Sequence, residues 1–332
     1  MRNLLTALGA IALATSLSGL SGCAYAKEVA LKDIKKLPGS CKQSEYGPGT
    51  YLRKTEQGGR ERRYIVHVPS GYRPDRQLPV IFFWHGGGSS PQGSRGWLGL
   101  EEMADQKGFL LVYPYGTGMM KRRLLGFNAG SCCGSAMKKN VDDVGFTVKM
   151  LDELEQTFCV DPRRVYSTGY SNGAMMSYRL ACELSDRIAA IAPVGGTLGF
   201  IDCKPNRAVS LMHFHGTKDP YEPYAGGKGE KSFPGKRDKT VFRSVDDSVM
   251  TWVRIIGASP TPTSEMKQGS ATRYVWGGGR NGSEVVLWRL EGGGHTWPGA
   301  KSMPLSFMLG DINRDVSANQ LMWEFFMKHP LN

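Results

Sequence analysis

Short runs of apolar and β-branched residues recur along the chain and constrain its fold more than any other feature. They cover residues 63–68, 79–84, 109–113, 164–168, 188–194, 209–215 and 284–290. Most of the later runs are continuous in hydropathy rather than alternating. This pattern is typical of strands that are buried on both faces of a parallel sheet.

Helical periods separate several of these runs. One predicted helix places its apolar residues on a single face and has Asp142 or Asp143 as its N-cap; the apolar residues are Val144, Val148, Leu151, Leu154 and Phe158. Further helices are expected at 174–184, 249–256 and 317–328. Strands that alternate with helices predict an α/β fold with a mostly parallel central sheet and helices on both faces. Residues 49–68, broken by Gly58-Gly59, predict an antiparallel hairpin at the edge of the sheet.

The length of 332 residues fits one large domain as well as two small ones. We find no repeat and no Pro-rich or Thr-rich linker, so the expected organisation is a single α/β domain over residues 40–332. The 43 glycines fall in clusters without a period, which excludes a collagen-like chain and predicts glycine-shaped loops.

The first 26 residues have the pattern of a signal peptide, with Arg2 followed by an apolar run over residues 4–20. Two cleavage sites are compatible with it. Residues 24–26 (Ala-Tyr-Ala) predict ordinary cleavage before Lys27, whereas Leu-Ser-Gly-Cys at 20–23 resembles a lipoprotein signal over 1–22 with lipidation of Cys23. Both readings predict export from a bacterial cell, to a secreted, periplasmic or lipid-anchored location. Contact with a membrane is expected only through a lipid on Cys23.

The cysteine count agrees with export to an oxidising compartment. Apart from Cys23, the chain has six cysteines, at positions 41, 132, 133, 159, 182 and 203. Six cysteines allow up to three disulfides in fifteen connectivities, and the sequence does not choose among them. No C-x-x-C pair occurs, which disfavours zinc and thioredoxin-like sites.

The residues Gly169-Tyr170-Ser171-Asn172-Gly173 form a G-x-S-x-G motif between a predicted strand and a predicted helix. The glycines permit a tight turn that exposes the Ser171 hydroxyl, and the helix N-terminus favours negative charge beside it. Ser171 is therefore the candidate nucleophile.

A serine nucleophile needs a base, and an acid must orient that base. Of six histidines, His295 alone lies on a glycine-rich loop just after the last predicted strand. Asp219 follows an earlier strand, and the chain order Ser171, Asp219, His295 is the order of α/β hydrolases. Asp246 and Asp247 are alternative acids, but both are expected to cap a helix.

A tetrahedral intermediate also requires N–H donors for its oxyanion. The backbone of Asn172, next to Ser171, is one candidate. The loop His85-Gly86-Gly87-Gly88-Ser89 follows a strand and supplies Gly86 and Gly87 as further candidates, because glycine has no side chain to block a substrate.

Two other patterns resemble metal sites. His213 and His215 alternate on one strand and share a face, but no third ligand is in view. Residues 311–315 begin like a calcium loop, yet they lack its glycine and its final glutamate, so a helix start is expected there instead. We therefore predict no metal and no cofactor.

The formal net charge is +12, from 42 Lys and Arg against 30 Asp and Glu. A basic surface favours polyanions of any kind. No nucleic-acid-binding module is present, so nucleic acid is not an expected partner. An acidic polysaccharide remains compatible with the charge.

Several segments together resemble the secreted esterase family of polyhydroxybutyrate depolymerase-like proteins, LpqC-like lipoproteins and bacterial feruloyl and acetylxylan esterases. They are FFWHGGGS, GFLLVYPYGT, FNAGSCCGSA with VDDVGF, VDPRRVYSTGYSNGAMMSYRLAC, IAAIAPVGG, HGTKDPYEPYAGG, GGGHTWPG and WEFF. The resemblance implies an α/β-hydrolase fold with Ser171 as nucleophile, Asp219 as acid and His295 as base. Ala174 departs from the family, which often has glycine there.

The resemblance implies an ester substrate. Short-acyl or phenolic esters, such as acetyl or feruloyl groups on plant polysaccharide, are the favoured class, since aromatic residues near the acid and base can stack on an aromatic acyl group. These candidate pocket residues are Trp297, Tyr170, Tyr221 and Tyr224. The alternative is hydrolysis of polyhydroxybutyrate or its oligomers, which the lack of a binding module disfavours for the insoluble polymer. A serine peptidase and a catalytically silent surface binding protein are weaker alternatives.

Overall fold

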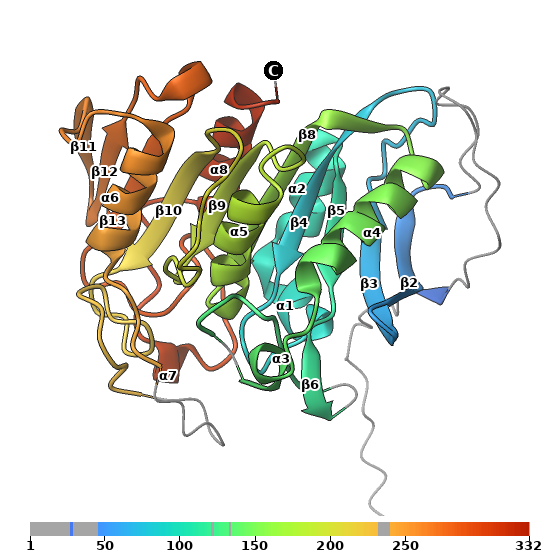
Figure 1. Cartoon of the computed structure of the whole chain (residues 1–332), viewed down its shortest axis with the longest axis horizontal. Coiled ribbons are helices and arrows are strands. Elements are labelled where there is room, and N and C mark those ends of the chain that lie inside the picture. The colour runs from blue at the N-terminus through green and yellow to red at the C-terminus, as the bar shows by residue number, and fades with distance from the viewer. Residues whose placement is uncertain (1–26, 29–45, 121–122, 133, 232–239, 332) are drawn as a thin grey trace, which may run out of the picture.

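A computed structural model describes residues 27–28, 46–120, 123–132, 134–231 and 240–331 (Figure 1). The predicted signal peptide, Cys23, Cys41 and Cys133 lie outside the described residues. Within those ranges, we find no helix with the length and apolar content needed to cross a membrane.

The strands form one eleven-stranded sheet and a separate two-stranded sheet. The strands of the large sheet are β1 Lys27–Glu28, β2 Gly49–Gln57, β3 Arg60–Val68, β4 Leu78–Trp84, β5 Leu110–Pro114, β8 Val160–Tyr170, β9 Ala190–Val194, β10 Ser210–Gly216, β11 Ser264–Gln268, β12 Ala271–Trp276 and β13 Val285–Leu290. The small sheet pairs β6 Thr117–Met120 with β7 Arg123–Gly126.

The large sheet has the order β1-β2-β3-β5-β4-β8-β9-β10-β13-β12-β11. Its six central strands, from β5 to β13, are all parallel to one another. Antiparallel pairs flank this centre, with β2 and β3 on one side and β12 and β11 on the other. The predicted mostly parallel sheet is confirmed, and the order of its strands is that of an α/β hydrolase.

Helices cover both faces of the sheet. They are α1 Pro91–Leu98, α2 Leu100–Lys107, α3 Gly134–Lys138, α4 Asp143–Thr157, α5 Asn172–Glu183, α6 Val245–Ile256, α7 Ser306–Leu309 and α8 Ala318–Lys328, with a 3₁₀ turn at Arg280–Gly282. α4, α5 and α6 lie in front of the sheet in Figure 1, and α2 and α8 lie behind it. α3, α7 and β6 lie at the lower edge of that view, where the central parallel strands end.

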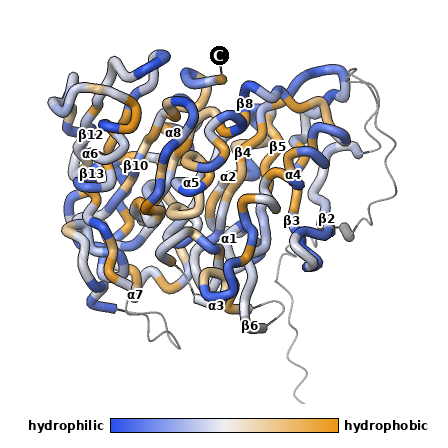
Figure 2. Tube along the Cα trace, in the orientation of Figure 1, coloured by the Kyte–Doolittle hydropathy of each residue, from blue (hydrophilic) through white to orange (hydrophobic). Residues whose placement is uncertain are grey.

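Two apolar cores result, one on each face. In β4, Phe82 and Trp84 belong to the core under α4, α5 and α6, whereas Ile81 and Phe83 belong to the core under α2 and α8. Burial on both faces explains why the central strands read as continuous apolar runs. Figure 2 shows hydrophobic residues concentrated along the central strands.

The expected hairpin is present, and its turn explains the glycine pair. β2 and β3 pair antiparallel from Gly49↔Val68 to Gln57↔Arg60, which leaves Gly58-Gly59 as a two-residue loop. Both glycines have positive φ, 59° and 67°, as a hairpin turn with the twist of the strands requires.

The helix caps differ in part from the prediction. Asp142 caps α4, since its side chain accepts from Gly145 N–H. For α6 the prediction is wrong: Ser244 is the N-cap, and Asp246 and Asp247 lie in the first turn, where their charge still complements the helix dipole.

The expected helix start at 311–315 is also wrong. α8 begins at Ala318 with Ser317 as N-cap. Asp315 instead accepts hydrogen bonds from the Ser270 N–H and hydroxyl, both at 2.7 Å, and so holds the turn between β11 and β12.

One disulfide is fully described. Cys182, near the end of α5, is bonded to Cys203 in the segment before β10. Cys132 and Cys159 are disulfide-bonded as well. All four candidate cysteines within the described ranges therefore form disulfides, in line with the expected oxidising compartment.

Candidate active site

Ser171 lies at the sharp turn between β8 and α5. Its backbone has φ 57° and ψ −123°, a conformation that costs a residue with a side chain roughly 1–3 kcal/mol. The Ser171 N–H donates to Val194 O at 3.0 Å, and the Ser171 carbonyl accepts from Ala174 and Met175. These hydrogen bonds to β9 and to the first turn of α5 hold the serine in its strained conformation.

The two glycines of the motif are required by close backbone contacts. A Cβ added at Gly173 would lie 1.9 Å from the Trp84 carbonyl oxygen, and one at Gly169 would lie 2.4 Å from the Gly173 oxygen. The end of β4 therefore packs directly on the turn. The absence of side chains at these two positions allows the approach.

Asp219 and His295 come together at the ends of neighbouring strands. β10 and β13 are parallel and paired, so the loops that follow them leave the same edge of the sheet. His295 Nδ1 lies 2.6 Å from Asp219 Oδ2, and both side chains are completely buried. Asp219 Oδ1 accepts from the backbone N–H groups of Tyr221 and Glu222 at 2.8 and 2.9 Å.

The electrostatics keep Asp219 ionised. Burial opposes its charge, but the attraction of His295 and the hydrogen bonds from His215 and His295 outweigh burial and hold the pKa of Asp219 well below its usual value. Asp219 therefore acts as a fixed carboxylate acceptor for the His295 Nδ1–H.

Ser171 and His295 lie on either side of the glycine pair that follows β9. A Cβ at Gly195 would lie 3.4 Å from His295 Nδ1, and one at Gly196 would lie 2.3 Å from the Ser171 carbonyl oxygen. The Tyr170 hydroxyl donates to the His295 carbonyl.

The predicted glycine loop reaches the nucleophile. A Cβ at Gly86 would lie 3.0 Å from the Tyr170 ring and 3.5 Å from Ser171 Cβ. Gly88 N–H donates to Leu125 O at 2.7 Å, and Ser89 N–H donates to Gly86 O at 3.1 Å. Gly86 thus lies beside Ser171, with Gly87 next to it in the chain.

His85 joins this loop to the segment after β5. Gly116 N–H donates to His85 Nε2 at 3.1 Å, so the proton is on Nδ1, which donates to Gly86 O at 2.8 Å. Burial lowers the pKa of His85 to about 4, although the bond to Gly86 opposes the shift. His85 is therefore a neutral ring that bonds both segments.

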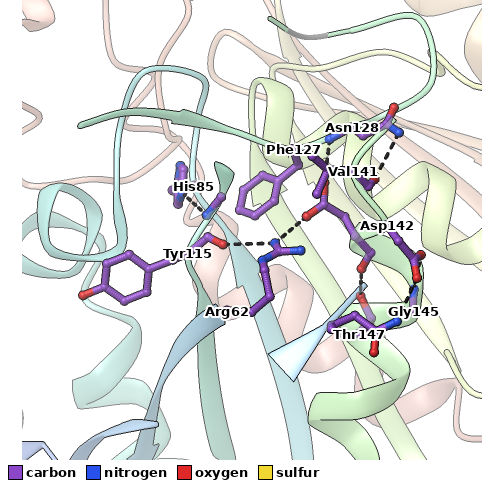
Figure 3. Close-up of polar contacts among 12 residues, drawn as sticks. Arg62, His85, Tyr115, Phe127, Asn128, Val141, Asp142, Gly145 and Thr147 are labelled. Carbon is purple, nitrogen blue, oxygen red and sulfur yellow. Dashed lines mark hydrogen bonds and ion pairs between the residues drawn. The ribbon is translucent and has the colours of Figure 1, made fainter. Parts of the chain in front are cut away.

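A buried ion pair supports the same segment (Figure 3). Arg62 donates to Asp143 Oδ1 at 2.6 Å and to the Tyr115 carbonyl at 3.3 Å. Asp143 Oδ2 accepts from Asn128 N–H at 2.7 Å. Of the two neighbouring aspartates, only Asp142 is a cap; the sequence analysis missed the buried ion pair of Asp143.

The Asn172 side chain has a contact that the sequence analysis also missed. Its Oδ1 accepts from Phe127 N–H at 2.7 Å, and its Nδ2 donates to Phe127 O at 3.1 Å. The residue after the candidate nucleophile therefore binds the backbone of the neighbouring segment. Its position in the motif predicted a role only for the backbone N–H.

The four candidate pocket residues separate into two pairs. The rings of Tyr170 and Tyr221 lie 4.9 and 5.4 Å from the His295 ring. The Tyr224 ring packs on His215, and its hydroxyl donates to Asp246. The Trp297 ring is buried against Phe83 and Trp97. Tyr170 and Tyr221 flank the imidazole, and the contacts of Tyr224 and Trp297 give no support to a place in the pocket.

His213 and His215 are bonded to each other, with His213 Nε2 3.2 Å from His215 Nδ1. In the segments that the structure describes, no three His, Cys, Asp or Glu side chains are grouped so that they could hold a metal ion.

The fold and this geometry agree with the comparisons to known proteins. A family model described as phospholipase/carboxylesterase matches residues 67–237, just over half of the chain. The chain therefore belongs to this family.

Individual relatives are similar over most of the chain. Feruloyl esterase B of Piromyces equi is 30% identical over 240 residues, which are 70% of this chain and 42% of that protein. Feruloyl esterase D of Neurospora crassa is 27% identical over 317 residues, covering 90% of this chain and 94% of that protein. The acetyl xylan esterase of Aspergillus awamori has a similar fold, with a TM-score of 0.56 at 13% identity over 83% of this chain and 98% of that one.

Proposed function

We propose that the chain is an exported serine esterase in which Ser171, His295 and Asp219 form the catalytic triad. The observation that carries the proposal is the 2.6 Å hydrogen bond between His295 and Asp219, buried beside the strained turn of Ser171. Backbone strain of this kind is found where a function requires it.

The proposed reaction proceeds through an acyl-enzyme. His295 Nε2 removes the hydroxyl proton of Ser171 as its oxygen attacks the ester carbonyl, and the same proton then passes to the departing alcohol or phenol. Water attacks the acyl-enzyme in the second half, again with His295 as base, and releases the acid and Ser171. The N–H groups of Asn172, Gly86 and Gly87 stabilise the oxyanion in both halves.

The proposed substrates are short-acyl or phenolic esters, including acetyl and feruloyl groups on plant polysaccharide. The names of the relatives support this class, since two are feruloyl esterases and a third is an acetyl xylan esterase. Tyr170 and Tyr221 beside His295 give an aromatic acyl group rings to contact.

Export rests on the signal-like leader and is supported by the disulfide of Cys182 with Cys203. Metabolic labelling with a fatty acid in the producing cell distinguishes the two signals: a labelled wild type and an unlabelled Cys23→Ala variant indicate a lipoprotein. An unlabelled wild type that begins at Lys27 indicates ordinary cleavage.

Hydrolysis of p-nitrophenyl acetate, p-nitrophenyl butyrate and methyl ferulate by the chain without residues 1–26 tests the function. We expect turnover of these esters and a loss of at least about 10³-fold in Ser171→Ala. The exposed Ser264→Ala on β11 is the control and should match the wild type. Cleavage of hydroxybutyrate oligomers without cleavage of methyl ferulate would overturn the substrate class, and turnover of peptide anilides alone would overturn the esterase assignment.

A further inference from the structure

A line of hydrogen-bonded side chains runs from α5 through β10 to the loop of Asp219. The Tyr178 hydroxyl on α5 is 2.9 Å from His213 Nδ1, and His213 Nε2 is 3.2 Å from His215 Nδ1. His215 Nε2 lies 2.8 Å from the Glu222 carbonyl and 3.4 Å from Asp219 Oδ2. Both histidines are on β10, and all of these residues, Glu222 included, are at most 5% exposed.

The Glu222 carbonyl, the last group of this line, determines which ring nitrogen of each histidine carries the proton. The Glu222 carbonyl can only accept, so His215 Nε2 carries a proton. In a neutral ring His215 Nδ1 is then an acceptor, and His213 Nε2–H donates to it. His213 Nδ1 in turn accepts from the Tyr178 hydroxyl. The three donors therefore point the same way along the line, toward the Glu222 carbonyl, and Asp219 Oδ2 lies 3.4 Å from the last donor atom, His215 Nε2.

The surroundings favour the neutral forms of His213 and Tyr178. Burial and the neighbouring His215 lower the pKa of His213 well below its usual value, and burial raises the pKa of Tyr178. The titratable groups near the line and the carboxylate that it reaches come from β10, α5, β8 and the loops after β10 and β13; they are Tyr170, Tyr178, His213, Asp219, Tyr221, Glu222, Tyr224 and His295. Arg289 on β13 lies over the Tyr224 ring.

We propose that His215, oriented by His213 and Tyr178, is a positioning residue for Asp219 in the catalytic triad. Its Nε2 lies 3.4 Å from Asp219 Oδ2, the oxygen that accepts the hydrogen bond from His295 Nδ1–H, and it donates to the Glu222 carbonyl in the loop that carries the acid. This inference rests on the proposed function. It assigns the two histidines a role in place of the metal pair that their spacing resembles.

Loss of the His215 donor has a defined electrostatic consequence. A carboxylate with one fewer donor attracts the protonated imidazole of His295 more strongly, and the ring also loses part of its support. The acid limb of kcat/KM, which reports the base of the free enzyme, should then move to higher pH.

Steady-state hydrolysis of p-nitrophenyl butyrate from pH 4 to 9 tests this, with thermal unfolding of each variant. For His215→Phe we expect kcat to fall about 10- to 100-fold with KM changed less than about 2-fold, because a misplaced acid acts on the chemical step. The acid limb should rise by about half a pH unit. His215→Gln, which keeps an N–H donor, should recover part of both effects. His329→Gln is the control: its ring bonds Ser210 and Glu284 instead.

A second background separates positioning from a general loss of structure. In Asp219→Asn, adding His215→Phe should change kcat by less than about 2-fold, since residues acting as a unit are not additive. If His215→Phe lowers kcat in the Asp219→Asn protein as much as it does in the wild type, the proposal is overturned. So would a folded His215→Phe with wild-type kcat and acid limb.

If His215→Phe does not fold, His213→Phe carries the test, because it removes the donor to His215 Nδ1 without contacting Asp219. The same upward shift of the acid limb is expected, and an unchanged limb overturns the inference. Retention of ester turnover in Ser171→Ala would instead overturn the proposed function, so the two failures are distinguishable.

Discussion

The geometry of the nucleophile depends on the absence of a side chain at Gly173. Gly173 is the second residue of α5, and its α-carbon faces the carbonyl of Trp84 at the end of β4. A methyl group there would lie 1.9 Å from that oxygen. Either the helix or the strand would have to move, and Ser171 would move with it.

Gly173→Ala should therefore lower the free energy of unfolding by about 2 kcal/mol or more and abolish most ester turnover, because overpacking rigid backbone is costly. Gly96→Ala is the matched control, since Gly96 is also helical but has open space around it. That variant should be more stable by up to about 1 kcal/mol. Urea unfolding and ester assays check both; wild-type values for Gly173→Ala would contradict the packing argument.

The buried His85 ring should make the free energy of unfolding depend on pH. Its pKa is about 4 in the fold, against 6.5 for an ordinary histidine, so folding favours the neutral ring. The unfolded chain takes up the proton first as the pH falls. The stability that depends on neutral His85 is thus complete above pH 6.5 and is lost progressively down to about pH 4, by roughly 3 kcal/mol.

In His85→Gln the free energy of unfolding should fall less steeply between pH 6.5 and 4 than in the wild type, by about one proton's linkage. Urea titrations at several pH values measure the slope. Equal slopes in the two proteins would show that His85 is not a neutral buried ring.

At the scale of elements, the segment from Tyr115 to Asn128 depends on the buried pair of Arg62 on β3 and Asp143 on α4. Asp143→Ala leaves a buried guanidinium without its partner and should destabilise the protein by about 3–5 kcal/mol. The double variant Arg62→Met with Asp143→Ala should be less destabilised than Asp143→Ala alone. Urea midpoints test this, and additive losses would contradict a coupled pair.

The sequence predicted the central strands well because each is apolar on both faces. It also indicated Asp219 and His295 as the acid and base proposed above, because each follows such a strand. It did not predict β11, whose five residues are all exposed and therefore carry no apolar signal. The strand exists because its backbone pairs with β12. The contacts of Asp143 and His215 were missed for a related reason, since residue spacing reports only local neighbours. Arg62, the partner of Asp143, is 81 residues away in the sequence. The Glu222 carbonyl reaches His215 only through the tertiary path of the loop after β10.

On the scale of the whole molecule, the net positive charge of the chain affects how it binds a charged substrate. With 42 basic and 30 acidic residues, attraction to an acidic polysaccharide should depend on salt. Between about 50 and 500 mM NaCl, kcat/KM on an acidic acetylated or feruloylated polymer should fall several-fold, while p-nitrophenyl acetate turnover changes less than about 2-fold. Equal salt dependence on both substrates would contradict charge-assisted binding.

The central claim is that Ser171 is the nucleophile of an ester hydrolase. Reaction with diethyl p-nitrophenyl phosphate, followed by intact-mass and peptide mass spectrometry, tests it most directly, because the reagent phosphorylates an activated serine. We predict one diethylphosphoryl group per chain, located on Ser171, with loss of ester turnover in proportion to labelling and no label in Ser171→Ala. Ester turnover that persists in a fully labelled protein, or labelling of another residue with Ser171 unmodified, would contradict the claim.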